Sequence, residues 1–205
     1  MDRNEIFKNI EEHLLNDEKP SIYLNDIKDN GLLNEYPFEL IKKLEKVDQS
    51  PKHHPEGNVW IHTMMVVDEG AKIRSRVDDK KAFMWALLLH DLGKFKTTKI
   101  RKGRLTSYDH DKVGEKETEE FLKCFDLSDK FIEKVTKLVR YHMHLLFVSK
   151  NMPYGNIEGM KKEADLETLS FVFEADRLGR GGVENKEEKE IKEEVERFRE
   201  KYIDK

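Results

Sequence analysis

The sequence has very little cysteine and no long hydrophobic run. Its single cysteine, Cys124, excludes an internal disulfide framework and is too few for a structural zinc cluster. No apolar stretch approaches the roughly 20 residues that a membrane span requires. The charged N-terminal segment MDRNEIFKNIEEHLL lacks the apolar core of a signal peptide. We therefore expect a reduced, cytoplasmic protein that does not enter the membrane.

The chain also lacks a large excess of either charge. It contains 38 Lys and Arg residues and 42 Asp and Glu residues, for a formal net charge of −4. Charged residues make up 39% of the sequence, against about 25% in an ordinary soluble domain. Interleaved charges of both signs are typical of long helices with solvated faces, and they exclude a general attraction to nucleic acid or anionic membrane. Any phosphate-binding surface must therefore be local.

Apolar residues at helical spacing occur along most of the 205-residue chain, whose length favours one domain. They predict helices over residues 4–15, 60–73, 82–91, 111–125, 128–147, 166–178 and from about 187 onward, with shorter helices after Pro20 and Pro37. Prolines and glycines predict loops over residues 47–58 and 151–159. A short β-hairpin is expected near residues 97–108, with Gly103 at the positive-φ position of its turn. These patterns predict a single all-α domain with one hairpin.

The doublet His90-Asp91 follows a strongly apolar segment, AFMWALLL at residues 82–89. A helix that is apolar on every face is buried, and an imidazole and a carboxylate buried at its end need a partner. A metal ion satisfies both, because His supplies a nitrogen ligand and Asp an anionic oxygen. Further candidate ligands lie on both sides of the doublet: His62, His110, His142 and Asp176.

Each of these residues also has a plainer interpretation. His90 and Asp91 could form a buried polar pair without metal, and Asp176 could form an ion pair with Arg177. A single His on an amphipathic helix, such as His62, is usually packed in the core. For His110 and His142, the alternatives are a second metal ion, a substrate contact or an ordinary core or surface position. His53 and His54 lie in a Pro-rich loop, where simple exposure is as reasonable as a role at the rim of a site.

Five segments contain these residues in the order and spacing found in the HD-domain metal-dependent phosphohydrolases: HHPEGNVWIHT, LLLHDLGK, SYDHDKVGEK, VRYHMHL and FEADRLGR. The resemblance covers roughly residues 51–182. The sequence is similar in particular to the C-terminal HD domain of bacterial tRNA nucleotidyltransferases (CCA-adding enzymes). No Gly-rich nucleotide-binding loop or Asp-x-Asp pair precedes residue 50, so the polymerase head of those enzymes is not expected here. We expect a helical segment over residues 1–50 packed on the core, the HD domain over 51–182 and a C-terminal helix over 183–205.

The resemblance implies a set of metal ligands and a reaction. The ligands would be His62, His90, Asp91 and Asp176, and in some related families Asp91 would bridge to a second ion, here held by His110 and His142. Mixed imidazole and carboxylate ligation suits Mn, Fe, Co, Ni or Zn and tolerates Mg. Such an ion offsets the charge of a phosphoryl group and lowers the pKa of its bound water. One or two divalent ions and a catalytic role for Asp91 are therefore expected.

Cationic residues near these ligands are candidates for binding phosphate. Lys94 lies four residues after His90, beyond a glycine that lets the chain turn, where its ammonium would assist catalysis by neutralising a substrate phosphate. The alternative is a solvated lysine. Arg177 and Arg180 could bind phosphate or brace Asp176. Six basic residues lie between positions 94 and 104, where a nucleotide or an RNA backbone could bind, unless the hairpin is merely solvated.

We therefore expect a metal-dependent phosphohydrolase that cleaves a phosphomonoester or a cyclic phosphodiester of a nucleotide-like substrate with metal-activated water. The alternatives are a non-catalytic HD module that binds a nucleotide or RNA, and a nucleoside triphosphohydrolase. The expected partner is a small phosphorylated substrate, a nucleotide above all, with RNA as a second candidate. The sequence predicts neither the metal nor the oligomeric state.

Overall fold

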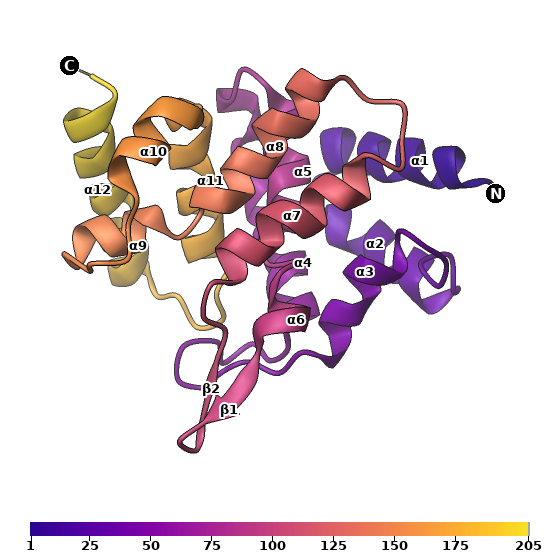
Figure 1. Ribbon diagram of the computed structural model, residues 1–205, viewed down its shortest axis with the longest axis horizontal. Coiled ribbons are helices and arrows are strands. Elements are labelled where there is room, and N and C mark those ends of the chain that lie inside the picture. The colour runs from indigo at the N-terminus through magenta and orange to yellow at the C-terminus, as the bar shows by residue number, and fades with distance from the viewer. Residues whose placement is uncertain (205) are drawn as a thin grey trace.

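The computed structural model describes residues 1–204, which form a bundle of α-helices with one two-stranded hairpin (Figure 1). The prediction of an all-α fold with a short hairpin is confirmed. The first half contains α1 (Arg3–Asn16), α2 (Pro20–Asp29), α3 (Glu39–Lys42), α4 (Val59–Ile73), α5 (Lys80–Leu89) and α6 (Lys94–Thr97), with 3-10 turns at Lys43–Lys46 and Arg74–Arg76. The second half contains β1 (Lys99–Arg101), β2 (Arg104–Thr106), α7 (His110–Leu122), α8 (Asp129–Tyr141), α9 (His144–Ser149), α10 (Ile157–Glu163), α11 (Leu166–Leu178) and α12 (Asn185–Tyr202).

Helix α5 is the core of the bundle. Every side chain from Ala82 to Leu89 is fully buried, and the helix contacts α1, α4, α8 and α11. A helix with no solvated face can be stable only if other elements surround it. The same enclosure covers the two residues that follow, so His90 and Asp91 are 1% and 2% exposed.

The first 50 residues supply α1 and α2, which cover α5 and α4. Helix α1 begins with a capping box, in which the Asp2 side chain accepts hydrogen bonds from the start of the helix and the Glu5 side chain accepts one from the Asp2 backbone. The Phe7 ring stacks on Trp85 of α5, with ring centroids 4.3 Å apart. The predicted apolar face of α1 is confirmed by the burial of Ile6, Phe7, Ile10 and Leu14.

The last helix packs on α11 along the predicted apolar stripe. Ile191, Val195 and Phe198 are buried, and the Phe198 ring lies 5.1 Å from that of Phe173 in α11. The remaining faces of α12 are charged and exposed. The limits placed at residues 50 and 182 stay predictions, and the end of the expected C-terminal helix, Lys205, lies outside the described residues.

The prediction of one long helix over residues 128–147 is wrong. Ser128 caps α8 as an N-cap should, because its hydroxyl accepts a hydrogen bond from the backbone of Phe131. The helix then ends at Tyr141, and α9 begins only at His144. At the break, the Val139 carbonyl accepts from both the backbone and the ring Nδ1 of His142, which replaces the regular helical hydrogen bond.

Two further segments refine the sequence-based expectations. Residues 157–159, expected in a loop, begin α10, whose N-cap Asn156 accepts a hydrogen bond from the backbone of Gly159. The hairpin forms with Ile100 opposite Leu105, and its turn places both Lys102 and Gly103 at positive φ, 50° and 74°. Positive φ at both central residues is the geometry that matches the twist of the two strands.

No helix within residues 1–204 has the length and apolar character needed to span a bilayer. The expected cytoplasmic location stays a prediction.

Candidate metal centre

Three helices of the bundle bring together the four ligands predicted for the first metal ion. His62 lies in the first turn of α4, His90 and Asp91 directly follow α5, and Asp176 lies near the end of α11. All four side chains are buried. Because α4, α5 and α11 contact one another, His62 and Asp176 meet although 114 positions separate them, with Nε2 of His62 3.1 Å from Oδ1 of Asp176.

Two glycines allow the close approaches that build this site. A Cβ at Gly179 would lie 2.7 Å from the Cα of Val66, so the missing side chain lets the end of α11 pack directly on the α4 backbone. A Cβ at Gly93 would lie 2.1 Å from the backbone oxygen of His110. Gly93 lies in the turn between α5 and α6 and has a helical φ of −64°, so it needs no left-handed backbone there. Its role is to let the start of α7 approach Asp91.

Backbone hydrogen bonds determine how three of the histidines face the site. The Nδ1 atoms of His90, His110 and His142 each lie 2.6–2.7 Å from a backbone oxygen. A carbonyl oxygen only accepts, so Nδ1 carries the proton and Nε2 keeps its lone pair for a metal. The three carbonyls belong to residues three positions earlier, Leu87, Ser107 and Val139.

The first group of donor atoms comes from His62, His90, Asp91 and Asp176. Nε2 of His90 lies 3.3 Å from Oδ2 of Asp91 and 3.9 Å from Oδ1 of Asp176, and Nε2 of His62 lies 3.9 Å from Oδ2 of Asp91. Two ligand atoms at about 2.1 Å from one ion lie about 3.0 Å apart at octahedral angles and about 3.4 Å apart at tetrahedral angles. The shortest spacings in the group, 3.1 and 3.3 Å, fall in this range.

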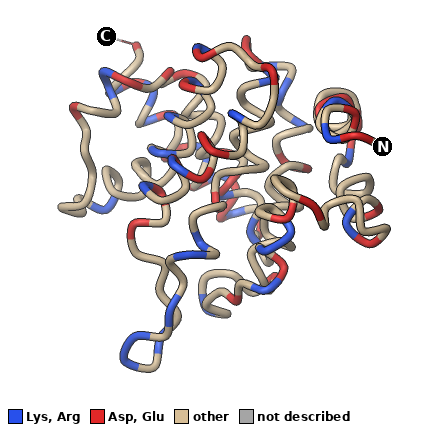
Figure 2. The backbone as a smooth tube through the Cα atoms, turned by 45° about the vertical axis from the view of Figure 1, so that its right-hand side comes forward, with Lys and Arg blue, Asp and Glu red and all other residues tan. Residues whose placement is uncertain are grey.

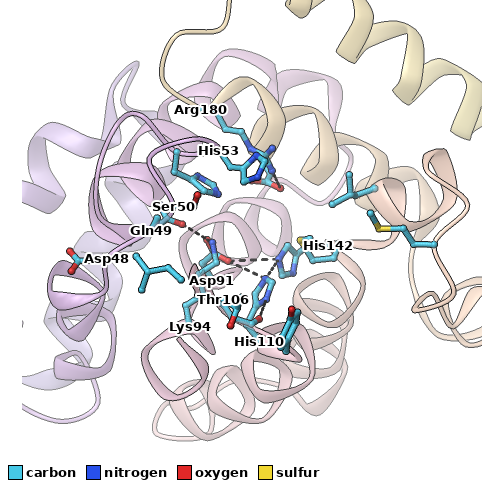
Figure 3. A pocket seen from close by; sticks show the side chains of 18 of the residues that line it. Asp48, Gln49, Ser50, His53, Asp91, Lys94, Thr106, His110, His142 and Arg180 are labelled. Carbon is cyan, nitrogen blue, oxygen red and sulfur yellow. Dashed lines mark hydrogen bonds and ion pairs between the residues drawn. The ribbon is translucent and has the colours of Figure 1, made fainter. Parts of the chain in front are cut away.

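The second group is formed by Asp91, His110 and His142, whose side chains point toward one another in the cavity shown in Figure 3. Oδ1 of Asp91 lies 3.4 Å from Nε2 of His110 and 3.8 Å from Nε2 of His142. The two Nε2 atoms lie 3.2 Å apart. With both Nδ1 atoms protonated, two lone pairs face each other, an arrangement that a shared cation stabilises. Asp91 therefore joins the two groups through its two oxygens.

The donor atoms fit divalent metal ions. Nε2 of His90 is buried without a hydrogen-bond partner among residues 1–204, and Oδ2 of Asp91 forms ion pairs with Lys94 at 2.7 Å and His90 at 3.3 Å but no regular hydrogen bond. Buried polar atoms are normally satisfied, and a metal ion would satisfy both. Imidazole nitrogens combined with carboxylate oxygens suit Mn, Fe, Co, Ni or Zn better than Ca.

Comparison with known proteins agrees with this geometry. The family model of the HD domain matches residues 59–181. The chain belongs to the HD-domain family. This span contains all six predicted metal ligands of the two groups, and HD domains bind divalent metal ions.

The curated relatives of this HD domain include proteins named multifunctional CCA proteins. The one from Actinobacillus pleuropneumoniae is 27% identical over 176 residues, which cover 83% of this chain and 42% of that protein. Those from Haemophilus influenzae and Methylococcus capsulatus are 28% and 29% identical, covering 88% and 82% of this chain and 44% and 39% of theirs. The predicted similarity to CCA-adding enzymes is confirmed. The chain spans less than half the length of these relatives.

The charge distribution keeps the two candidate ligand aspartates, Asp91 and Asp176, ionised. Burial alone would raise the pKa of Asp91, but the charge of Lys94 and the neighbouring His90 hold it well below the ordinary value. Burial opposes ionisation of Asp176 in the same way, while the hydrogen bond from His62 and the charge of Arg180 hold its pKa well below the ordinary value. Both residues are thus ready to act as anionic ligands.

Glu56 is a part of the site that the sequence did not single out. Its side chain is 2% exposed, its Oε1 lies 2.9 Å from Nδ1 of His62 and from Nδ1 of His54, and its Oε2 accepts a hydrogen bond from the backbone of Gly181. The contact with His62 is an ion pair off the line of a straight hydrogen bond. A carboxylate behind a ligand histidine orients the ring and increases its basicity. Its place in the segment HHPEGNVWIHT was the only signal.

The pKa values of the ligand histidines His62, His110 and His142 are shifted in different directions. Burial and the nearby His110 lower the pKa of His142 to about 3, and burial lowers that of His110 as well. For His62, burial acts in the same direction, but its contacts with Asp176 and Glu56 outweigh it and raise the pKa. His110 and His142 are therefore neutral ligands near pH 7, whereas His62 must lose a proton to bind metal.

The predicted phosphate-binding residues lie in different surroundings. Lys94 lines the cavity with its side chain only 11% exposed, and its Nζ lies 2.7 Å from both Oδ2 of Asp91 and Oε1 of Gln49. Arg180 also lines the cavity, 3.8 Å from Asp176, and its Nε has no hydrogen-bond partner among the described residues. Arg177 is instead paired with Glu194 of α12 at 3.2 Å. Lys94 and Arg180 are thus placed to contact a ligand beside Asp91.

Three further histidines lie outside the set of predicted metal ligands. His53 is exposed at the edge of the same cavity, whereas His54 is largely buried and paired with Glu56. A third, His144, is fully buried, and its Nε2 accepts a hydrogen bond from the backbone of Asn156.

Proposed function

We propose that the protein is a metal-dependent phosphohydrolase that cleaves a phosphomonoester or a cyclic phosphodiester of a nucleotide-like substrate. The observation that carries this proposal is two buried clusters of His and Asp side chains that share Asp91 and reach one cavity through Asp91, Asp176, His110 and His142. A site that only stored a structural metal would be closed by its ligands. Here a cavity of about 410 Å³ adjoins the ligands, within the range of small-molecule sites.

The cavity combines cationic and polar groups suited to a phosphate. Lys94 and Arg180 supply positive charge, and Gln49 and Ser50 supply hydrogen-bonding groups from the loop before α4. A lysine binds phosphate as a point charge, and an arginine binds it through a planar fork of donors. Gln49 already accepts from Lys94, so it keeps the ammonium beside Asp91.

The residues of the site would have different roles in hydrolysis. His62, His90, Asp91 and Asp176 would hold the first ion, and His110 and His142 with Asp91 a second. Bound there, a divalent ion supplies positive charge to the phosphoryl group and lowers the pKa of water. Lys94 and Arg180 would neutralise and orient the phosphoryl oxygens.

The related CCA proteins support a nucleotide-like substrate but do not extend the proposal further. Because the chain spans less than half of each of them, nucleotidyl transfer is not part of the proposed activity. A cytoplasmic location and a role for Arg177 in binding substrate remain predictions from the sequence.

The test is hydrolysis by protein stripped of metal with EDTA and then supplied with Mg, Mn, Fe, Co, Ni or Zn. The substrates are 2′,3′-cyclic AMP, 2′-AMP, 5′-AMP, ATP and a generic aryl phosphate. The expected result is turnover that requires added metal and is lost in Asp91→Ala. Asp126→Ala, an exposed aspartate between α7 and α8, is the matched control and should keep full activity.

The alternatives predict different results in the same assay. Release of triphosphate from ATP would identify a triphosphohydrolase. Absence of turnover with every metal, from protein whose circular dichroism shows it to be folded, would contradict the hydrolase and favour a module that only binds.

A further inference from the structure

A second hollow lies beside the cavity that contains Asp91. This hollow, called here the aromatic groove, has a volume of about 790 Å³ and is lined by Tyr108, Phe147, Met152 and Tyr154 among others. Tyr108 and His110 line both the groove and the Asp91 cavity, so the two hollows adjoin. The groove lies between the end of the hairpin and the segment that follows α8. The proposed hydrolysis gives it no role.

Two tyrosines in this groove are exposed to solvent. Tyr108 is 65% exposed and Tyr154 is 72% exposed. The Tyr154 ring packs edge-on against Phe147, with centroids 6.0 Å apart and an angle of 69°. Clustered exposed apolar side chains mark interaction sites, and exposed aromatic rings bind unpaired bases by stacking.

The border of the groove is positively charged. Residues 94–107 contain no carboxylate, and four of their cations lie on the hairpin: Lys99, Arg101, Lys102 and Arg104. Figure 2 shows the blue of Lys and Arg along this hairpin. The Arg101 guanidinium lies 5.0 Å from the centre of the Tyr108 ring, which links the cations to the aromatic surface.

The groove's own carboxylates do not cancel this charge. Asp109 is paired with Lys112 at 2.7 Å, and Asp111 is paired with the buried guanidinium of Arg140. An anionic ligand that carries aromatic rings therefore finds complementary charge and stacking surfaces side by side.

We propose, on the basis of the proposed function, that the aromatic groove binds the bases at the phosphorylated 3′ end of a single-stranded RNA while the hairpin contacts its backbone. The terminal phosphate would then lie at Asp91, and the bases before it would stack on Tyr108 and Tyr154. Single strands are required, because paired bases cannot leave their stack at low cost. RNA is required for the cyclic substrate, because a 2′,3′-cyclic phosphate needs a 2′-oxygen.

Binding is measured by fluorescence anisotropy with an eight-nucleotide RNA that carries a 5′ fluorescein and a 3′ phosphate, in EDTA so that no hydrolysis occurs. Tyr108→Ala and Tyr154→Ala are each expected to weaken binding about tenfold, and Tyr108→Phe and Tyr154→Phe to restore it. Tyr36→Ala removes a third exposed tyrosine, 54% exposed, that does not line the groove, and this variant should bind normally.

The contribution of the hairpin is measured through salt dependence. In Arg104→Ala, the slope of log affinity against log salt concentration is expected to fall by about 0.7, the amount for one phosphate contact on a single strand. Lys189→Ala, an exposed lysine of α12, is the matched control and should leave the slope unchanged.

Equal affinity for a blunt RNA duplex, or full affinity in the Tyr108→Ala and Tyr154→Ala double variant, would each overturn the proposal. Hydrolysis of the aryl phosphate by the wild-type protein is measured in parallel with added metal. If that hydrolysis occurs but RNA affinity is unchanged in the tyrosine variants, only the assignment of the groove is refuted. If RNA affinity falls in the tyrosine variants but no hydrolysis is detected, the assignment of the groove is supported and the proposed enzymatic activity is refuted.

Discussion

Replacing Glu56 with glutamine is expected to weaken binding of a divalent metal by about 10- to 100-fold, the usual effect of changing a residue behind a metal ligand. The factor corresponds to about 1.4–2.7 kcal/mol. Glutamine keeps the size of the side chain and an oxygen that can accept from Gly181, but it removes the negative charge 2.9 Å from Nδ1 of His62. Metal binding should weaken because His62 loses the partner that orients it and increases its basicity.

The same substitution should change the number of protons released when metal binds. In the metal-free protein, burial lowers the pKa of His62, but Asp176 and Glu56 outweigh it and raise the pKa above the ordinary 6.5. At pH 6.5 most His62 side chains are therefore protonated, and a metal ion must displace that proton. Without the charge of Glu56 the pKa falls, so fewer protons are released.

Isothermal titration calorimetry with Mn²⁺ at pH 6.5, in two buffers of different ionisation enthalpy, measures both the affinity and the proton count. Glu117→Gln is the matched control, because Glu117 is another buried glutamate with a cationic partner, Lys96, and belongs to neither ligand group. Wild-type affinity and wild-type proton release in Glu56→Gln would refute the role assigned to this carboxylate.

Three further predictions follow from the packing and charge of the site. Gly93→Ala should lower the free energy of unfolding in urea by about 1–3 kcal/mol, because its Cβ meets backbone rather than a flexible side chain, whereas Gly103→Asn should stay near wild type. The stability of metal-free protein should fall as pH drops from 6.5 towards 4, because His54 and His142, with pKa values lowered to about 4 and about 3, gain protons mainly when unfolded. The pKa of His62 is raised, so its contribution has the opposite sign and is lost as pH rises above 6.5. Equal unfolding midpoints at pH 5 and pH 7 in EDTA would show that the histidines with lowered pKa values do not dominate. Mn²⁺ at 100 times its Kd should raise the free energy of unfolding by about 2.7 kcal/mol in wild type and by none in Asp91→Asn, as measured by thermal melts.

Most of the helices could be predicted from the sequence, since their apolar spacing and caps are local features. Helix α11 has the predicted bounds, and α4 and α5 differ by one or two residues at their ends. Apolar spacing and composition failed at two places where a short-range hydrogen bond of one polar side chain decides the backbone. The sequence has no proline or glycine at the break between α8 and α9, which depends on the hydrogen bonds of His142. The polar residues before α10 indicated a loop, although Asn156 caps a helix there.

The site shows the same division. The sequence by itself determined that a buried apolar helix ends in His90 and Asp91, and that further histidines and an aspartate are available in the right order, because residue type and burial pattern are local properties. Only the tertiary structure decided which atoms meet. Asp91 directs one oxygen to each ligand group, Gly93 lets α7 approach, and Glu56 lies behind His62 because the loop before α4 folds back on Gly181. Such contacts depend on the relative positions of elements far apart in the chain, and side-chain spacing along one helix carries no information about them.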